Sequence, residues 1–185
     1  VSPQGSDFSE PVTQNTKRFV RCFWALDKSL AYARHYPAIN WNTSYSEYVD
    51  TLNRWYSANV GREFMADRQR IATLLHEEND LMENVKLIGS DVLPDDQKLV
   101  IETAKVIRVG FLQQNAFHQE DTSVPMEKQF LMMETILYLY EKCRALVNRG
   151  MPVSVLKEDK IFERIIAIKY EVPNKEPERF DEYHK

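Results

Sequence analysis

Glycine and basic charge are both scarce in this sequence, and each shortage excludes a class of function. Only five glycines occur in 185 residues, and there is no GxxxxGK segment followed by Ser or Thr. Lys28–Ser29 has no glycine loop before it, so a phosphate-binding loop is absent from this sequence. The net charge of -4 and the pI of about 5.6 provide no basic face to replace phosphate counterions. We therefore expect no nucleic-acid partner.

Cysteines and long apolar runs are also few. Cys22 and Cys143 lie far apart and form no metal-ligand pair, so we expect two reduced, buried thiols in a cytosolic protein. The longest apolar run, residues 130–140, contains Glu134 and is shorter than the roughly 18 residues that span a bilayer. We expect no direct membrane insertion, so any membrane association would come through partners. The Pro/Gly/Ser-containing start at Val1 resembles an interior loop, which predicts a piece of a longer protein.

The sequence pattern of residues 11–34 predicts one helix followed by a short strand. Apolar spacing predicts a helix over residues 11–27, with Pro11 in its first turn and Ser9 as its cap. Its inward face would carry Phe19, Cys22, Phe23 and Leu26. The alternation of residues 28–34 predicts a short strand.

From Thr43 onward the pattern is helical almost without a break. A helix start signal lies near Ser90, Asp91 and Pro94, and the helix that it begins should end at about residue 114. The other four expected helices cover residues 45–58, 63–86, 125–148 and 153–170. The stripe of the fourth helix predicts core, not a cofactor site; it consists of Met126, Phe130, Met133, Leu137, Tyr140 and Val147. The fold class is thus all-α, a compact helical bundle of five or six helices. The charged, proline-containing end is expected to be mobile.

Familiar catalytic signatures are missing. The histidines are scattered, and HEEND at residues 76–80 lacks the second histidine of a zinc-protease helix. We interpret HEEND as a solvated helix face. No nucleophile motif is present. The residues alone therefore indicate a helical domain without its own active site, such as a protein-interaction or scaffold domain that binds no nucleotide.

HYPAINW at residues 35–41 places large aromatics where a polar connection is expected. Tyr36 precedes Pro37, which disfavours helical geometry and places Tyr36 on a loop. Such an aromatic either fills the core or forms a platform for a flat ligand. The residues do not separate these two alternatives.

Three stretches, VSPQGSDFSEPVT, HYPAINWNTSYS and GFLQQNAF, resemble signatures of the catalytic A subunit of V-type (vacuolar/archaeal-type) rotary ATPases and ATP synthases. They occur in the family's order and spacing between Val1 and about residue 155. The resemblance implies that residues 1–42 end an α/β nucleotide-binding domain, leaving only a short remnant of it here. Residues 43–171 would form the C-terminal helical domain, and residues 172–185 a mobile tail.

The resemblance also implies function and partners. The intact subunit would bind ATP or ADP with Mg²⁺, although we expect no nucleotide bound to this fragment, whose phosphate-binding loop and catalytic glutamate would lie upstream. Its partners would be the B subunits of the alternating catalytic hexamer and the central rotor stalk. It would be cytoplasmic, peripheral to the membrane through the complex, and coupled to proton or sodium transport. The fragment would contain no catalytic residue and should be inactive alone.

Particular residues receive roles by the same resemblance. Tyr36 and Pro37 would form one side of the adenine pocket and Ala116 and Phe117 the other. Gln114, together with Gln113 and Asn115, would form its polar edge, although these three residues could instead only cap the third helix. Without the resemblance, buried core aromatics would be the simpler interpretation of Tyr36 and Phe117.

A second group would contact the rotor. Asp7, Ser9 and Glu10 match a loop that touches the central shaft in related subunits. Ser9 and Glu10 could equally cap the helix that follows, whereas Asp7 lies too far upstream to cap it.

Overall fold

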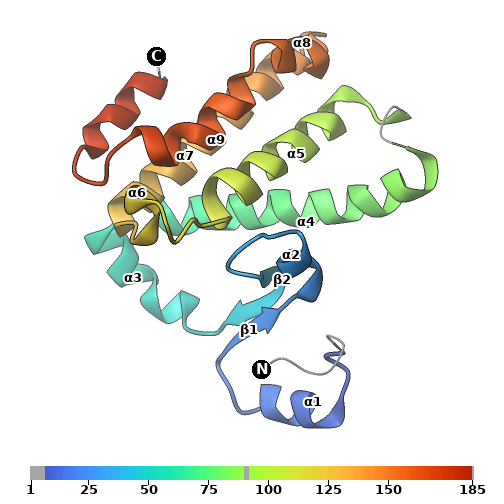
Figure 1. The fold of residues 1–185 in the computed structure, drawn as a ribbon, viewed down its shortest axis with the longest axis vertical. Coiled ribbons are helices and arrows are strands. Elements are labelled where there is room, and N and C mark those ends of the chain that lie inside the picture. The colour runs from blue at the N-terminus through green and yellow to red at the C-terminus, as the bar shows by residue number, and fades with distance from the viewer. Residues whose placement is uncertain (1–6, 90–91, 185) are drawn as a thin grey trace.

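The structure, a computed structural model, describes residues 7–89 and 92–184; the segment VSPQGS and the capping candidates Ser90 and Asp91 lie outside this range. A small α/β unit packs beneath a larger helical domain (Figure 1). The α/β unit consists of α1 (Pro11–Lys17), β1 (Cys22–Leu26), α2 (Lys28–Tyr32) and β2 (Ile39–Ser46). The helical domain consists of α3 (Val49–Asn59), α4 (Phe64–Ile88), α5 (Asp95–Val106), the π-helix η3 (Ile107–Leu112), α6 (Gln119–Thr122), α7 (Met126–Val147), α8 (Val153–Glu158), α9 (Ile161–Glu171) and the 3-10 helix η4 (Pro177–His184). The predicted helical fold class with a short α/β remnant is confirmed.

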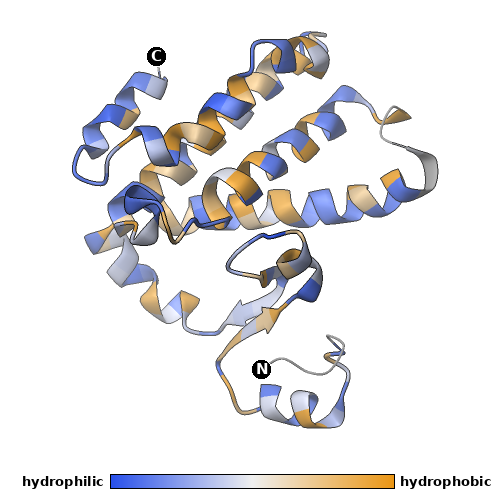
Figure 2. Ribbon diagram, in the orientation of Figure 1, coloured by the Kyte–Doolittle hydropathy of each residue, from blue (hydrophilic) through white to orange (hydrophobic). Residues whose placement is uncertain are grey.

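The helical domain has one main core. Helices α4, α5, α7 and α9 pack together, and hydrophobic and hydrophilic residues are interspersed along them (Figure 2). The predicted stripe of α7 contributes to this core: Met133 and Leu137 are buried, and Phe130 and Tyr140 pack against the cluster. The assignment of this stripe to core packing is confirmed.

The α/β unit differs from the sequence prediction. Helix α1 ends at Lys17, and the residues expected to continue it form β1, which pairs antiparallel with β2. Burial alternates along β1, and Phe23 stacks on Tyr45 with ring centroids 5.8 Å apart. The cross-strand aromatic pair therefore overrides the apparent helical spacing. Phe19, Leu26 and Cys22 are exposed, so the predicted inward face is wrong for them, while Cys143 is buried as expected; both cysteines are free.

Other boundaries also shifted. The predicted strand at residues 28–34 is wrong: Asp27 accepts a hydrogen bond from Ser29 N at 2.8 Å and caps helix α2. The helix expected over residues 45–58 begins only at Val49, because β2 continues to Ser46. The single helix expected over residues 153–170 is divided into α8 and α9 at Lys160, whose φ of 53° is left-handed.

The last residues that the structure describes, 177–184, pack against the helical domain. Residues of η4 lie along α7, and Phe180 is buried in a small cluster with Met132, Ile168 and Val172. The expectation of a mobile tail over residues 172–185 therefore does not fit residues 177–184, because Phe180 is buried and Tyr183 packs against the same cluster. HEEND was also misinterpreted in part, since Glu78 is buried and forms an ion pair with Arg108.

Candidate functional site

Two loops far apart in the sequence meet at one edge of the molecule. One connects α2 to β2 and carries Tyr36; the other follows η3 and carries Gln114. Gln114 N donates a hydrogen bond of 2.7 Å to the carbonyl of Tyr36, and Gln113 Nε2 lies 3.4 Å from the carbonyl of Arg34. The backbone of each loop therefore fixes the position of the other.

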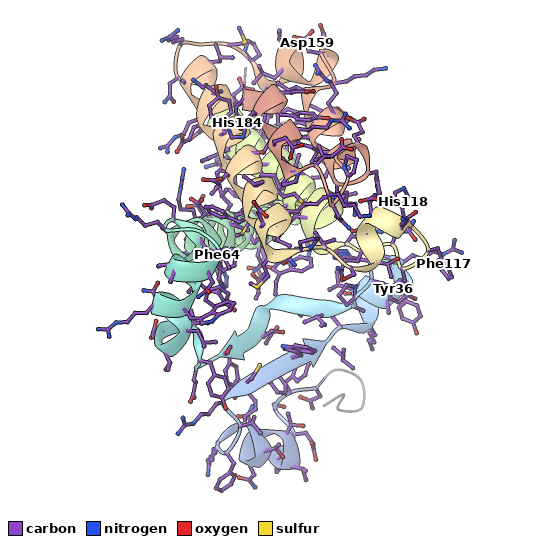
Figure 3. The ribbon with its side chains drawn as sticks, turned by 90° about the vertical axis from the view of Figure 1, so that its left-hand side faces the viewer. Tyr36, Phe64, Phe117, His118, Asp159 and His184 are labelled. Carbon is purple, nitrogen blue, oxygen red and sulfur yellow. The ribbon has the colours of Figure 1, made fainter. Side chains whose placement is uncertain are left out.

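The side chains at this junction face solvent. Tyr36 is 54% exposed and Phe117 is fully exposed, and both project to the same side of the molecule (Figure 3). Pro37, Gln114 and Ala116 are also exposed. Burial of Tyr36 and Phe117 as core aromatics is therefore wrong. Phe117 therefore contributes no packing within the part of this chain that the structure describes.

His35 connects the first loop to the protein core. Its ring is buried and makes an edge contact with Trp41, with centroids 5.5 Å apart, and Trp41 packs against the main core. Burial, followed by the charges of Arg108 and Lys169, lowers the pKa of His35 below its ordinary value of 6.5. A neutral His35 thus faces inward while the next residue, Tyr36, faces out.

The second loop follows the π-helix η3. Gly110 in η3 lies against α9, and a Cβ placed there would come within 3.1 Å of the Cα of Ile166. Glycine therefore allows close packing of η3 on α9. At Gln113 the chain turns to an extended conformation, with φ -72° and ψ 131°, and the loop begins. Short π-helical segments are often found at functional sites.

Side chains shape the rest of this loop. Asn115 Oδ1 accepts a hydrogen bond of 3.0 Å from Phe117 N. The Thr122 hydroxyl is shared between two carbonyls of the loop, with Oγ1 2.8 Å from that of His118 and 3.0 Å from that of Ala116. Asp121 Oδ2 accepts one of 2.6 Å from Asn115 N. The exposed Phe117 is therefore carried on a loop with several fixed points.

A buried ion pair lies under the loop, and the sequence analysis missed it. Lys169 on α9 and Asp121 on α6 are 2% and 3% exposed, and Lys169 Nζ lies 3.2 Å from Asp121 Oδ2. Nζ also donates a hydrogen bond of 2.6 Å to the carbonyl of Gln113. One signal was available for Lys169, which follows Ile165 by four residues on the apolar face of its helix. Asp121, in a polar stretch, gave no such signal.

In the loop expected to touch a rotor, the side chains of Asp7 and Glu10 bond to nearby residues, while Phe8 makes an edge contact with Phe23 of β1, with centroids 5.8 Å apart. Asp7 Oδ1 accepts hydrogen bonds from Ser9 N at 3.0 Å and Ser9 Oγ at 2.5 Å, and these bonds lower the pKa of Asp7. The cap of α1 is Glu10, whose Oε2 accepts from Thr13 N at 3.2 Å. The prediction of Ser9 as the cap is therefore wrong, whereas Glu10 does cap the helix.

Neither a metal centre nor a membrane span is found where the structure can be inspected. Across residues 7–89 and 92–184, no group of three or more His, Cys, Asp or Glu side chains could hold a metal ion. Within those same ranges, no helix combines the length and the apolar character needed to cross a bilayer.

Comparison with known proteins places this geometry in a family. Residues 53–155, more than half of the chain, match the C-terminal domain of V and A type ATP synthase. The chain belongs to the alpha/A subunit family of V- and A-type ATP synthases. Residues 1–46 match the nucleotide-binding domain of the ATP synthase alpha/beta family.

Relatives of the A subunit align over almost the whole chain. The V-type ATP synthase alpha chain of Halothermothrix orenii is 52% identical over 97% of this chain and 30% of its own length. The A subunit of the A-type ATP synthase of Ignicoccus hospitalis is 48% identical over 100% of this chain and 31% of its own length. The chain thus spans about a third of the length of these A-subunit relatives.

A solved structure shares the fold. The ATP synthase subunit NeqB from Nanoarcheaum equitans aligns with a TM-score of 0.61 and 17% identity, covering 74% of this chain and 32% of that one. At this level of identity the likeness concerns the fold alone.

Proposed function

We propose that this chain is the C-terminal part of the catalytic A subunit of a rotary ATP synthase or ATPase, and that it supplies the adenine side of the nucleotide pocket. Tyr36 and Pro37 form one wall, Ala116 and Phe117 the other, and Gln114 the polar edge. The observation that carries this proposal is the hydrogen bond from Gln114 N to the Tyr36 carbonyl, which joins two loops bearing exposed aromatics.

The chemistry of the junction suits a flat base. Adenine is a planar π system, and stacking on an aromatic side chain is worth about 1–3 kcal/mol per base. The exposed rings of Tyr36 and Phe117 provide such a face. Such a surface recognises the base, while the phosphates and Mg²⁺ are held by residues that this sequence does not contain.

The function of the whole subunit follows from its family. ATP hydrolysis or synthesis would be coupled to proton or sodium transport, with this chain forming the helical domain that faces the rotor. Mg²⁺ would bridge the phosphates of ATP in the intact subunit, where it neutralises developing charge. B subunits of the alternating hexamer and the central stalk would be the partners, and the complex would attach the subunit to the membrane from the cytoplasmic side.

The test is Phe117→Ala in the full-length subunit within the assembled complex. Because stacking is made in the ground state and the transition state alike, its loss should raise KM for ATP about five- to tenfold with a smaller change in kcat. Trp55→Ala is the matched control, since Trp55 is a half-exposed aromatic on α3. An unchanged KM in Phe117→Ala, with the complex intact, would contradict the adenine assignment.

A scaffold domain without nucleotide binding gives a different result in the same experiment. In that case the exposed aromatics would contact protein, so Phe117→Ala would weaken assembly and leave KM for ATP unchanged in the complexes that still form.

A further inference from the structure

We propose that Lys169 and Asp121 are positioning residues for nucleotide binding: together they hold both ends of the Gln113–Asn115 segment, and so place Phe117 against the base. This inference rests on the proposed adenine role of Phe117. Neither residue reaches the pocket surface, and each acts through the loop that lies above it.

Lys169 holds the first end of the segment. Its ammonium group donates hydrogen bonds to the carbonyls of Gln113 at 2.6 Å and Val109 at 3.3 Å, and it lies 3.2 Å from Asp121 Oδ2. An ammonium has three protons, so these three acceptors match its full donor capacity. The contacts converge where η3 ends and the loop begins, which fixes the exit direction of the chain at Gln113.

Asp121 holds the second end. The same Oδ2 that faces Lys169 accepts the 2.6 Å hydrogen bond from Asn115 N. One carboxylate oxygen therefore connects α9, through Lys169, with the backbone two residues beyond Gln113. Between these fixed points, Gln114 N is directed at the Tyr36 carbonyl at 2.7 Å. The two walls of the proposed pocket are thereby set relative to one another.

Stability is a poor explanation for this buried pair. Removing two charges from water is costly, and apolar replacements of buried ion pairs are often neutral or stabilising. The pair provides directed hydrogen bonds that an apolar pair could not make: the ammonium donates to the carbonyls of Gln113 and Val109, and the carboxylate accepts from Asn115 N. Gln113 and Asn115 both lie within four residues of Phe117.

The experiment compares single and paired replacements in the full-length subunit within its complex. Lys169→Met alone leaves the Asp121 carboxylate buried and unpaired, so the midpoint of thermal unfolding should fall and KM for ATP should rise about tenfold. Lys169→Met with Asp121→Asn removes the unpaired charge and keeps an oxygen that accepts from Asn115 N. The unfolding midpoint of the double variant should therefore recover, while KM for ATP stays raised about tenfold, because Gln113 has still lost its partner.

A base-free ligand separates positioning from a general defect. Tripolyphosphate contacts only the phosphate side, so its inhibition constant should change less than twofold in the double variant. Recovery of KM together with the unfolding midpoint would overturn the proposal, and so would an equal weakening of tripolyphosphate. Phe117→Ala tests the adenine role separately. An unchanged KM for ATP in Phe117→Ala would remove the adenine role itself. A raised KM in Phe117→Ala, combined with a normal KM in the double variant, would remove only the role of Lys169 and Asp121.

Discussion

The imidazole of His184 stacks on the ring of Tyr138, with centroids 4.8 Å apart and planes inclined by 6°. His184 Nε2 also lies 3.0 Å from Thr135 Oγ1, and Tyr138 donates its phenolic hydrogen to the carbonyl of His184 at 3.0 Å. Because Thr135 Oγ1 donates its own hydrogen to the carbonyl of Leu131, it accepts from the imidazole. Helix η4 is therefore docked on α7 by directed contacts as well as by the apolar side chain of Phe180.

We expect Phe180→Ala to destabilise the subunit. Phe180 is buried, and truncating a buried phenylalanine typically costs about 3–5 kcal/mol of unfolding free energy. Glu178→Ala, an exposed change in the same helix, should leave the free energy of unfolding nearly unchanged. Chemical denaturation measures both. Equal stability of Phe180→Ala and the parent would mean that η4 is not docked in solution.

Glu134 should make the protein less stable at neutral pH. Burial, then the charges of Asp67 and Glu63, raises the pKa of Glu134 above its ordinary value of 4.5. The folded state thus binds more protons than the unfolded state between the ordinary and the raised pKa, so stability falls as pH rises through that window. Glu134→Gln should raise the unfolding midpoint near pH 7, and the gain should vanish at roughly pH 3, well below the ordinary pKa of 4.5, where the carboxyl is protonated in both states.

The control for that pH series is Glu83→Gln, an exposed change on α4. Its unfolding midpoint should follow the parent's at every pH. A Glu134→Gln gain of the same size at both pH values would show that the charge of Glu134 is not responsible.

Replacing Asp7 and replacing Glu10 should have different effects in the assembled complex. Asp7→Ala should reduce coupling of ATP turnover to rotation. It should leave thermal stability unchanged, because Asp7 is exposed and its side chain accepts hydrogen bonds from Ser9, two residues further along the same loop. Glu10→Ala removes the cap of α1 and should cost about 0.5–2 kcal/mol of stability, with normal turnover per folded complex. Stability and rotor-dependent turnover are measured on both variants. Loss of stability with normal coupling in Asp7→Ala would make Asp7 a structural residue.

The chain expressed by itself should not hydrolyse ATP and should bind adenine nucleotides only weakly. Phosphate contacts and metal bridging supply most of the affinity and catalysis in such sites, and this sequence has no phosphate-binding loop. Titration calorimetry with ATP and Mg²⁺, together with a phosphate-release assay, measures both properties. Micromolar binding or turnover by the pure chain would refute this prediction.

Long helices were predictable here and short elements were not. The stripe of α7 repeats over many turns, so its period and its burial agree with the structure, as at Met133 and Leu137. Strand β1 has only five residues, and its identity depends on pairing with β2, a contact that local spacing cannot reveal. Phe180 was misjudged for the same reason, because its partners lie on distant helices.

In the proposed site, too, some residues could be predicted from the sequence and others could not. Tyr36 and Phe117 were reached through motifs, and the structure adds that both are exposed on adjoining loops. The support beneath them was invisible in the sequence, because Lys169 and Asp121 gain meaning only when α9 and α6 are brought against the loop. A lone aspartate in a polar stretch carries no signal of burial.

The contact between Lys169 and the Gln113 carbonyl also means that the loop can be completed only late in translation. Tyr36 leaves the ribosome first, the loop with Phe117 follows, and α9 emerges later still. Until Lys169 has been translated and folded against η3, the carbonyl of Gln113 lacks its ammonium partner and Asp121 lacks its counter-charge. A nascent chain therefore cannot complete the hydrogen bonds of this loop until α9 has been made, so we expect the loop to be unsettled in a ribosome-bound chain stalled before Lys169.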